Sequence, residues 1–125
     1  MTDIKNIKIG EEQEKYNIAI CTVNSADIEV VKGNDGKIVG DKLVLNCTHP
    51  DVKESLDMSK VKYEKGNKIA ISGIWINTDK DGKIPFRSAL ACMLRYYKKE
   101  SIKDLVGISL ETAKDDNDFL VIKAY

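Results

Sequence analysis

The chain has a single tryptophan, Trp75, and the residues around it suggest a chemistry that the rest of the sequence lacks. It lies in the apolar stretch 68–77, where two isoleucines alternate before Ser72-Gly73 and two alternate in the opposite phase after it. A β-bulge at that slip would return all four isoleucines to one core. Trp75 would then lie on the outer face with Lys68 and Ser72. An outward indole among ammonium groups can stack a nucleic-acid base and attract phosphate.

Residues for other chemistry are sparse. His49 is the only histidine, and it stands before a proline, so we expect an exposed or capping side chain. Cys21, Cys47 and Cys92 are too far apart for a metal site or a disulfide framework, and we expect small buried hydrophobes. The turn 79–83 has an Asp-x-Asp-Gly sequence but lacks the rest of a calcium loop. We therefore predict a protein that is not an enzyme, with no cofactor and no metal.

Length and charge narrow the class of protein. A chain of 125 residues fits a single domain over residues 1–125, with residues 1–15 forming either a strand or a loose arm. Its 20 basic and 20 acidic residues balance, so bulk attraction to nucleic acid or anionic lipid is absent. The stretch 79–99 departs from this balance, with six basic and two acidic residues. No apolar run approaches the roughly 20 residues that span a bilayer, and residues 1–10 lack a signal-peptide core, so we expect a cytoplasmic protein.

The first half of the chain reads as β-structure. Residues 16–23 predict a strand buried on both faces, and residues 26–30 alternate as a half-buried strand, so both pieces could form one long bent strand. The sequence Gly-Asn-Asp-Gly within 32–37 predicts a hairpin turn. The return strand is predicted at 38–48, with alternate apolar side chains inward and Lys42 and Asn46 outward.

The second half supplies helices and a final hairpin. Ser88 is a predicted N-cap for a helix to about Lys98, and Ser101 for a short helix to Val106. Gly107 suits a left-handed C-cap position. Two further strands, 108–113 and 119–125, are joined by an acidic turn.

This order of elements predicts an α+β, mainly β fold. The pattern β-β-β-α-β-β is that of an OB-like five-stranded Greek-key barrel with a helix between strands 3 and 4. The alternative is an open antiparallel sheet with helices packed on one face.

On an OB-like barrel the face of strands 2 and 3 binds single-stranded nucleic acid, and we predict that function here. The sequence does not distinguish DNA from RNA. The predicted nucleic-acid-binding residues are Lys42, Asn46, Lys68, Ser72 and Trp75 on the face, and Lys80 and Lys83 at its rim.

The alternative function is protein interaction or oligomerisation without nucleic-acid affinity. An exposed Trp75 can anchor a protein partner. The strand Phe119–Tyr125, if it lay at a sheet edge, could pair with another protein or with a second copy of the chain. Neither hypothesis involves a membrane.

Overall fold

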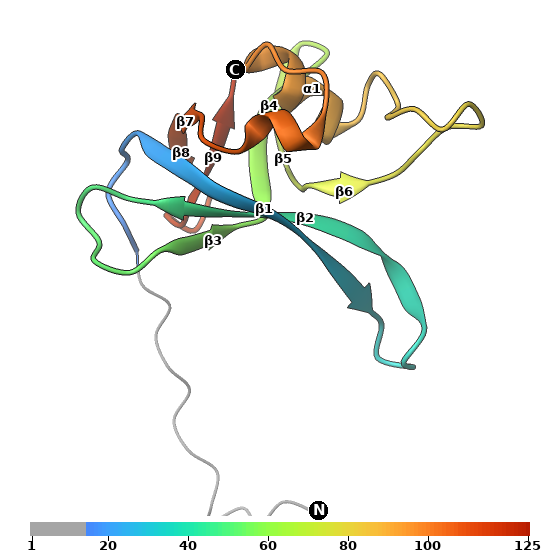
Figure 1. Ribbon diagram of the computed structural model, residues 1–125, viewed down its shortest axis with the longest axis horizontal. Coiled ribbons are helices and arrows are strands. Elements are labelled where there is room, and N and C mark those ends of the chain that lie inside the picture. Colours follow the sequence, from blue (N-terminus) through green and yellow to red (C-terminus); the bar gives the residue numbers. More distant parts are fainter. Residues whose placement is uncertain (1–14) are drawn as a thin grey trace, which may run out of the picture.

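The computed structural model describes residues 15–125, so the strand or loose N-terminal segment expected at 1–15 lies almost wholly outside the described residues. Its longest elements are β1 (Cys21–Lys32) and β2 (Ile38–Thr48), a hairpin whose distal part projects from the molecule (Figure 1). The bounds of β2 match the prediction. The turn contains Gly36 with φ of 79°, which glycine adopts without steric cost. We call the projecting part of this hairpin, residues 27–42, the arm.

Within residues 15–125, nine strands form two sheets. The first sheet has the order β3-β2-β1-β7. β3 pairs with residues 45–47 of β2, and β6 pairs with residues 41–42 of the same strand. The short strands of this sheet are β3 (Leu56–Met58), β6 (Trp75–Ile76) and β7 (Ser109–Leu110). The second sheet has the order β5-β4-β9-β8. Its strands are β4 (Lys60–Lys65), β5 (Lys68–Gly73), β8 (Thr112–Lys114) and β9 (Leu120–Ala124).

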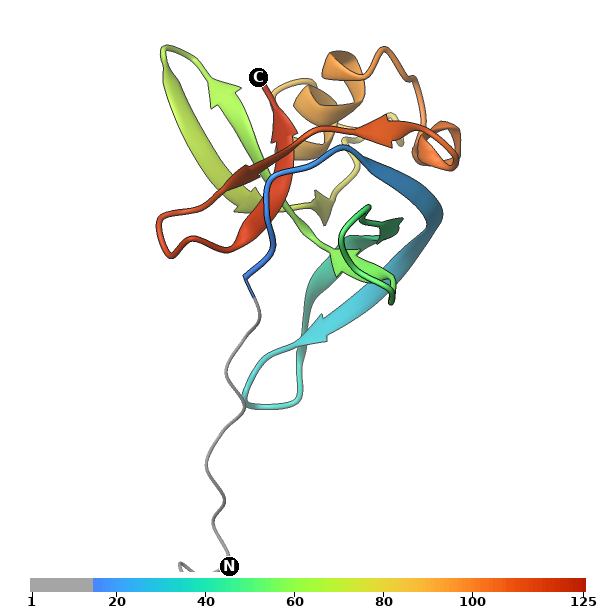
Figure 2. The ribbon, with the colours of Figure 1, turned by 90° about the vertical axis from the view of Figure 1, so that its left-hand side faces the viewer.

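The two sheets are joined where the chain passes directly from one to the other. Only Ser59 separates β3 from β4, and only Glu111 separates β7 from β8. Neighbouring strands are antiparallel, except that β4 and β9 are parallel. The result is a mostly β fold that curls into a half-barrel (Figure 2).

One α-helix, α1 (Ala89–Tyr96), packs against β4, β6 and β9. As predicted, Ser88 caps it, because its hydroxyl accepts a hydrogen bond from the Ala91 N–H at 3.1 Å. The second helix is a 3-10 turn, η2 (Ile102–Leu105), followed by Gly107 with φ of 88°. Ser101 does not cap η2, since its hydroxyl donates to the Asp104 carboxylate instead. Neither helix in residues 15–125 is long and apolar enough to cross a bilayer.

The hydrophobic core lies inside the curl, under α1. Alternation along β2 specifies its inner face, since every second residue from Leu43 to Cys47 is fully buried. Facing side chains come from all the other major elements: Val23, Val61, Leu90, Met93, Leu105, Leu110 and Ile122. The core is therefore shared by both sheets and both helices.

The long bent strand is confirmed, but it begins later than predicted. β1 starts at Cys21 and is continuous to Lys32, with a register shift between Val23 and Ser25. Ile18 and Ile20, expected inside, are each about 60% exposed. They precede the first ladder pair with β7, and no ladder within residues 15–125 includes them.

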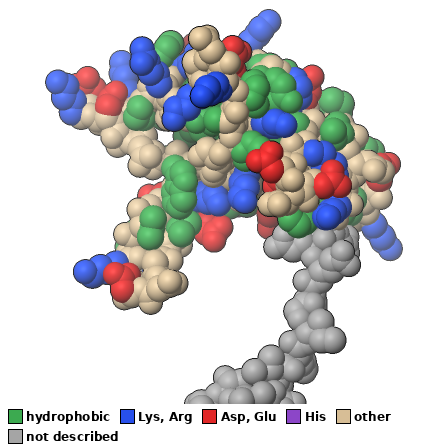
Figure 3. All heavy atoms as spheres, turned by 180° about the vertical axis from the view of Figure 1, so that it is seen from behind, with side chains coloured by type: hydrophobic (Ala, Val, Ile, Leu, Met, Phe, Trp, Pro, Cys, Tyr) green, Lys and Arg blue, Asp and Glu red, His purple; other side chains and the backbone are tan. Residues whose placement is uncertain are grey.

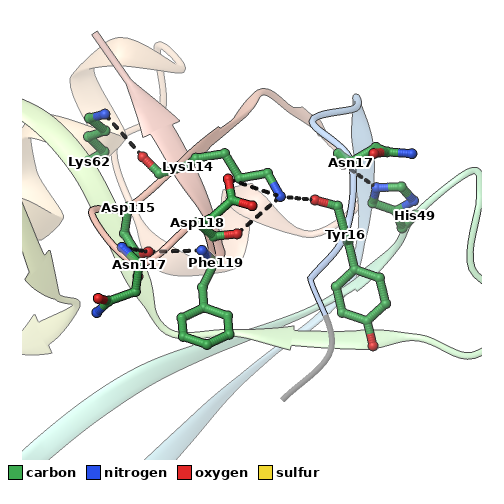
Figure 4. A network of polar contacts seen from close by, with 9 residues as sticks. All are labelled: Tyr16, Asn17, His49, Lys62, Lys114, Asp115, Asn117, Asp118 and Phe119. Atoms are coloured by element: carbon green, nitrogen blue, oxygen red, sulfur yellow. Dashed lines mark hydrogen bonds and ion pairs between the residues drawn. The ribbon is translucent and has the colours of Figure 1, made fainter. Parts of the chain in front are cut away.

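Side-chain hydrogen bonds hold the segment 16–20, which precedes β1, against the second sheet (Figure 4). The Lys114 ammonium donates to the carbonyl of Tyr16, and the Thr112 hydroxyl bonds both the N–H and the carbonyl of Ala19. His49, expected to be exposed or capping, is buried under the segment. Its Nδ1 accepts from the Asp51 N–H at 3.0 Å, and its Nε2 lies 2.7 Å from the Asn17 carbonyl, to which it donates. Both ring nitrogens therefore have structural roles.

β9 does not lie at a sheet edge, so the condition for the predicted pairing of this strand with another protein or a second copy is not met. β9 lies between β4 and β8, with Val61–Tyr63 on one side and 112–114 on the other. Both rows of its backbone groups face another strand, so Phe119–Tyr125 has no open edge to offer another protein or a second copy. The edges of the second sheet are β5, which pairs with β4, and β8, which pairs with β9.

Candidate nucleic-acid interface

The phase slip at Ser72-Gly73 marks a change of partner strand. β5 pairs with β4 as far as Gly73, and after Ile74 the chain joins the first sheet as β6 beside β2. Ile74 bridges the two, donating its N–H to the Ser59 carbonyl and accepting from the Leu43 N–H. It is fully buried, as expected. The prediction that all four isoleucines enter one core is wrong, because Ile69 lies on the edge strand β5 and is 47% exposed.

Trp75 lies on the outer side of β6, half-buried and outside the core. It is the ladder partner of Lys42, whose Nζ lies 5.6 Å from the centre of the indole. Two glycines form its seat. A Cβ added at Gly40 would lie 3.4 Å from Trp75 Cε3, and one at Gly73 would lie 3.1 Å from Nε1. The ring thus lies close to the backbone at Gly40 and Gly73 and beside the Lys42 side chain.

The two rim lysines follow Trp75 along the chain. Lys80 and Lys83 are exposed in the connection between β6 and α1. A tight turn presents them, in which the Asp79 carboxylate accepts from the N–H groups of Asp81 and Lys83 at 2.9 and 3.0 Å. Figure 3 shows Lys and Arg side chains gathered over this part of the molecule, at the upper left.

Three of the predicted site residues lie elsewhere. Lys68 and Ser72 are on β5, in the other sheet, and the Ser72 hydroxyl donates to the Gly73 carbonyl. Asn46 is at the far end of β2, where its amide donates to Ser55 and Asp57. The predicted continuous basic face therefore does not form. The prediction assumed that residues 68–76 pair with β2 throughout, whereas β6 alone does.

The outer face of β1 and β2 is also more acidic than predicted. Asp27 lies opposite Val44, Glu29 opposite Lys42, and Asp57 of β3 opposite Asn46. Carboxylates repel phosphate, so this part of the face is unfavourable for a polyanion. The favourable region is the side of Trp75 that leads into the β6–α1 connection.

Sequence reasoning missed an aromatic residue in this connection. Phe86 is 73% exposed, and the Arg95 guanidinium lies 3.9 Å from the centre of its ring. The signal that could have found this pair is the excess of basic residues in 79–99, which surrounds a phenylalanine outside the apolar stripe of α1.

The described residues offer little else for catalysis or metal binding. Cys21 and Cys47 are buried and Cys92 is half-buried. Burial, with smaller contributions from Cys21 and Asp57, raises the pKa of the Cys47 thiol to about 12, so it stays protonated at neutral pH. Within residues 15–125 no group of three or more His, Cys, Asp or Glu side chains is placed to hold a metal ion.

Comparison with known proteins gives no relative from which a role could be transferred. No protein-family model matches the chain, and searches of curated proteins and of solved structures find no match either.

Proposed function

We propose that the chain is an OB-like domain, without enzymatic activity, that binds single-stranded nucleic acid. The order of strand pairing supports the fold. Taking β3/β4 and β7/β8 as single strands, the pairs run β1–β2–β3/β4–β9–β8/β7 and return to β1. A five-stranded OB barrel has this circuit, and α1 lies between its third and fourth strands.

The observation that carries the proposed function is the placement of Trp75. An indole that contributes to the core would be enclosed by apolar side chains, whereas this one rests on Gly40 and Gly73 beside the Lys42 ammonium. Stacking of a base on an aromatic side chain is worth about 1–3 kcal/mol, and a neighbouring ammonium adds attraction for phosphate. One stacking site and a few lysines correspond to modest affinity.

The acidic face sets the path of the strand. Asp27, Glu29 and Asp57 disfavour a path across β1 and β3, while Lys80 and Lys83 favour one along the β6–α1 connection. The proposed interface therefore consists of Lys42, Trp75, Lys80 and Lys83.

Titration of the full chain with a 15-nucleotide oligothymidylate at low salt tests this function. Since Trp75 is the only tryptophan, stacking should quench the emission of the protein, and the affinity should fall steeply as salt is raised. Lys42→Gln should weaken binding several-fold and lower the salt dependence by about one counterion. Lys37→Gln at the tip of the arm removes the same charge away from the indole and serves as the matched control. Unchanged emission at micromolar protein would contradict the proposal.

A protein-interaction role is the second candidate, and it rests on the arm. Ile28, Val30, Ile38 and Val39 are each 50–68% exposed, and Figure 3 shows hydrophobic side chains along the arm, at the lower left. Contiguous exposed apolar side chains are typical of interaction sites. If a second copy covers the arm, light scattering after size-exclusion should give a dimer mass that Ile28→Glu reduces to a monomer. A wild-type monomer at every concentration would exclude self-association.

A further inference from the structure

Beside the proposed interface lies a groove that the sequence did not predict. It has a volume of about 690 Å³ and lies between the β6–α1 connection and α1. That volume is within the range of small-ligand sites. Its floor is apolar and its rim is charged, and the residues used below are Lys83, Ile84, Phe86, Leu94, Arg95 and Lys99.

The aromatic side of the groove is built rigidly. Arg95 donates from Nη1 to the backbone carbonyl of Phe86 and from Nη2 to Cys92 Sγ, which fixes the guanidinium over the ring. The chain on the other side of Phe86 is held by Ser88, which bonds the Pro85 carbonyl through both its N–H and its hydroxyl. The backbone carbonyls of Pro85 and Phe86 are therefore both hydrogen-bonded, while most of the Phe86 side chain faces water.

This arrangement leaves one ring face open. Arg95 covers one face of Phe86, and the 73% exposure of the side chain requires that much of the rest is accessible. The open face of an aromatic ring can stack a base, and a cation beside the ring attracts the phosphate that accompanies the base. Beyond its two bonds, the guanidinium has three further N–H donors.

The charges of the groove suit an anion next to that ring. Lys83, Arg95 and Lys99 contribute three positive charges, against Asp79 and Glu100. The Asp79 carboxylate is already engaged by two backbone N–H groups of its own turn. The floor of Ile84 and Leu94 is apolar and suits the flat surface of a base rather than a second charge.

From this combination we infer that the groove binds one nucleotide of the strand, with its base stacked on the open face of Phe86 and its phosphate held by Arg95, Lys83 and Lys99. The inference rests on the proposed function and adds a second stacking site to Trp75. A strand that follows the β6–α1 connection would meet Trp75 first and Phe86 at its end, since ten residues separate them.

Anisotropy of a fluorescein-labelled 15-nucleotide oligothymidylate, titrated with the full chain, tests the site. Phe86→Leu keeps an apolar side chain but removes the ring, and it should weaken binding about five- to a hundredfold. Phe86→Trp should restore or exceed wild-type affinity. Arg95→Gln should weaken binding and lower the salt slope by about one, whereas Lys103→Gln on η2, which removes an equal charge outside the groove, should change neither.

The outcomes separate this site from the proposed function. If Phe86→Leu binds within twofold of wild type while Trp75→Leu loses affinity, the groove is not part of the interface and the proposed function stands. If the wild-type chain does not bind at low salt, both fall. Thermal unfolding identifies variants that fail to fold. If Arg95→Gln fails to fold, the variants Phe86→Leu and Phe86→Trp still test the site, because a side chain as exposed as Phe86 contributes little to folding.

Discussion

Tyr97 joins the end of α1 to the point where the chain crosses between the two sheets, and its hydroxyl should carry a large share of that junction's stability. The hydroxyl donates to the Lys123 carbonyl of β9 at 2.6 Å and accepts from the Glu111 N–H at 2.9 Å. Glu111 is the single residue between β7 and β8. Tyr97→Phe keeps the ring and removes both bonds, which leaves two backbone groups in a partly buried position without this partner.

The magnitude follows from these two bonds. Each contributes about 1 kcal/mol net, and a backbone group deprived of its partner adds a desolvation cost, so we expect a loss of about 2–3 kcal/mol in the free energy of unfolding. Tyr96→Phe is the matched control. Its ring packs edge-on against Tyr97, with centroids 4.9 Å apart, but its hydroxyl bonds the Glu111 carboxylate rather than backbone. That substitution should cost less than about 1 kcal/mol.

Urea unfolding followed by circular dichroism measures both variants. For a chain of this size the expected loss lowers the Tyr97→Phe midpoint by about 1 M. If the two variants agree within about 0.5 kcal/mol, the hydroxyl does not brace the junction and the reasoning is refuted.

Three further predictions concern glycine, thiols and pH. Gly73→Val should destabilise the fold by more than about 1 kcal/mol and change the emission of Trp75, because a Cβ there would lie 3.1 Å from the indole, which the branched side chain would displace. Fluorescence-detected unfolding checks this, and unchanged emission would contradict it. A disulfide reagent should label Cys92 in the folded chain and reach Cys21 and Cys47 only on unfolding, and labelling of all three at equal rates would count against the fold. Burial raises the pKa of the Cys47 thiol from 9.0 to about 12, so the unfolded chain loses this proton at a lower pH than the folded chain does. The contribution of Cys47 to the free energy of unfolding should therefore be full below pH 9 and fall as pH rises from 9 toward 12. Urea midpoints of wild type and Cys47→Ala across that range test this, and equal pH dependence would exclude Cys47 as the cause.

Local patterns were sufficient where one strand or one turn determined the outcome. The alternation from Leu43 to Cys47 predicted the faces of β2, the turn at 32–37 and the His49-Pro50 pair predicted its bounds, and Ser88 marked the start of α1. The slip at Ser72-Gly73 marked the position of an irregularity, although the irregularity is a change of partner strand and not the predicted β-bulge. These features depend on neighbours close in sequence, which is why the sequence alone could reveal them.

The partner of β5 was missed, although the turn that determines it is local. The chain 60–73 forms its own hairpin through Gly66, whose φ of 61° suits a tight turn, so β5 pairs with β4 rather than with β2. The Gly66-Asn67 pair was a visible turn signal. Gly73 allows the Trp75 and Lys42 side chains to approach the backbone closely, and its φ is not positive. Because β5 pairs with β4, Lys68 and Ser72 do not lie on the predicted face.

The parallel pairing of β4 with β9 has a consequence for synthesis. Val61 pairs with Ile122, which is synthesised about 60 residues later. At ribosomal rates of roughly 5–20 residues per second, the synthesis of the residues between them takes about 3–12 seconds. During that interval one side of β4 has no neighbour, although its hairpin with β5 can already form. A nascent chain is thus exposed to aggregation at this side of β4 until β9 emerges, and slowing translation between β5 and β9 should lower its soluble yield.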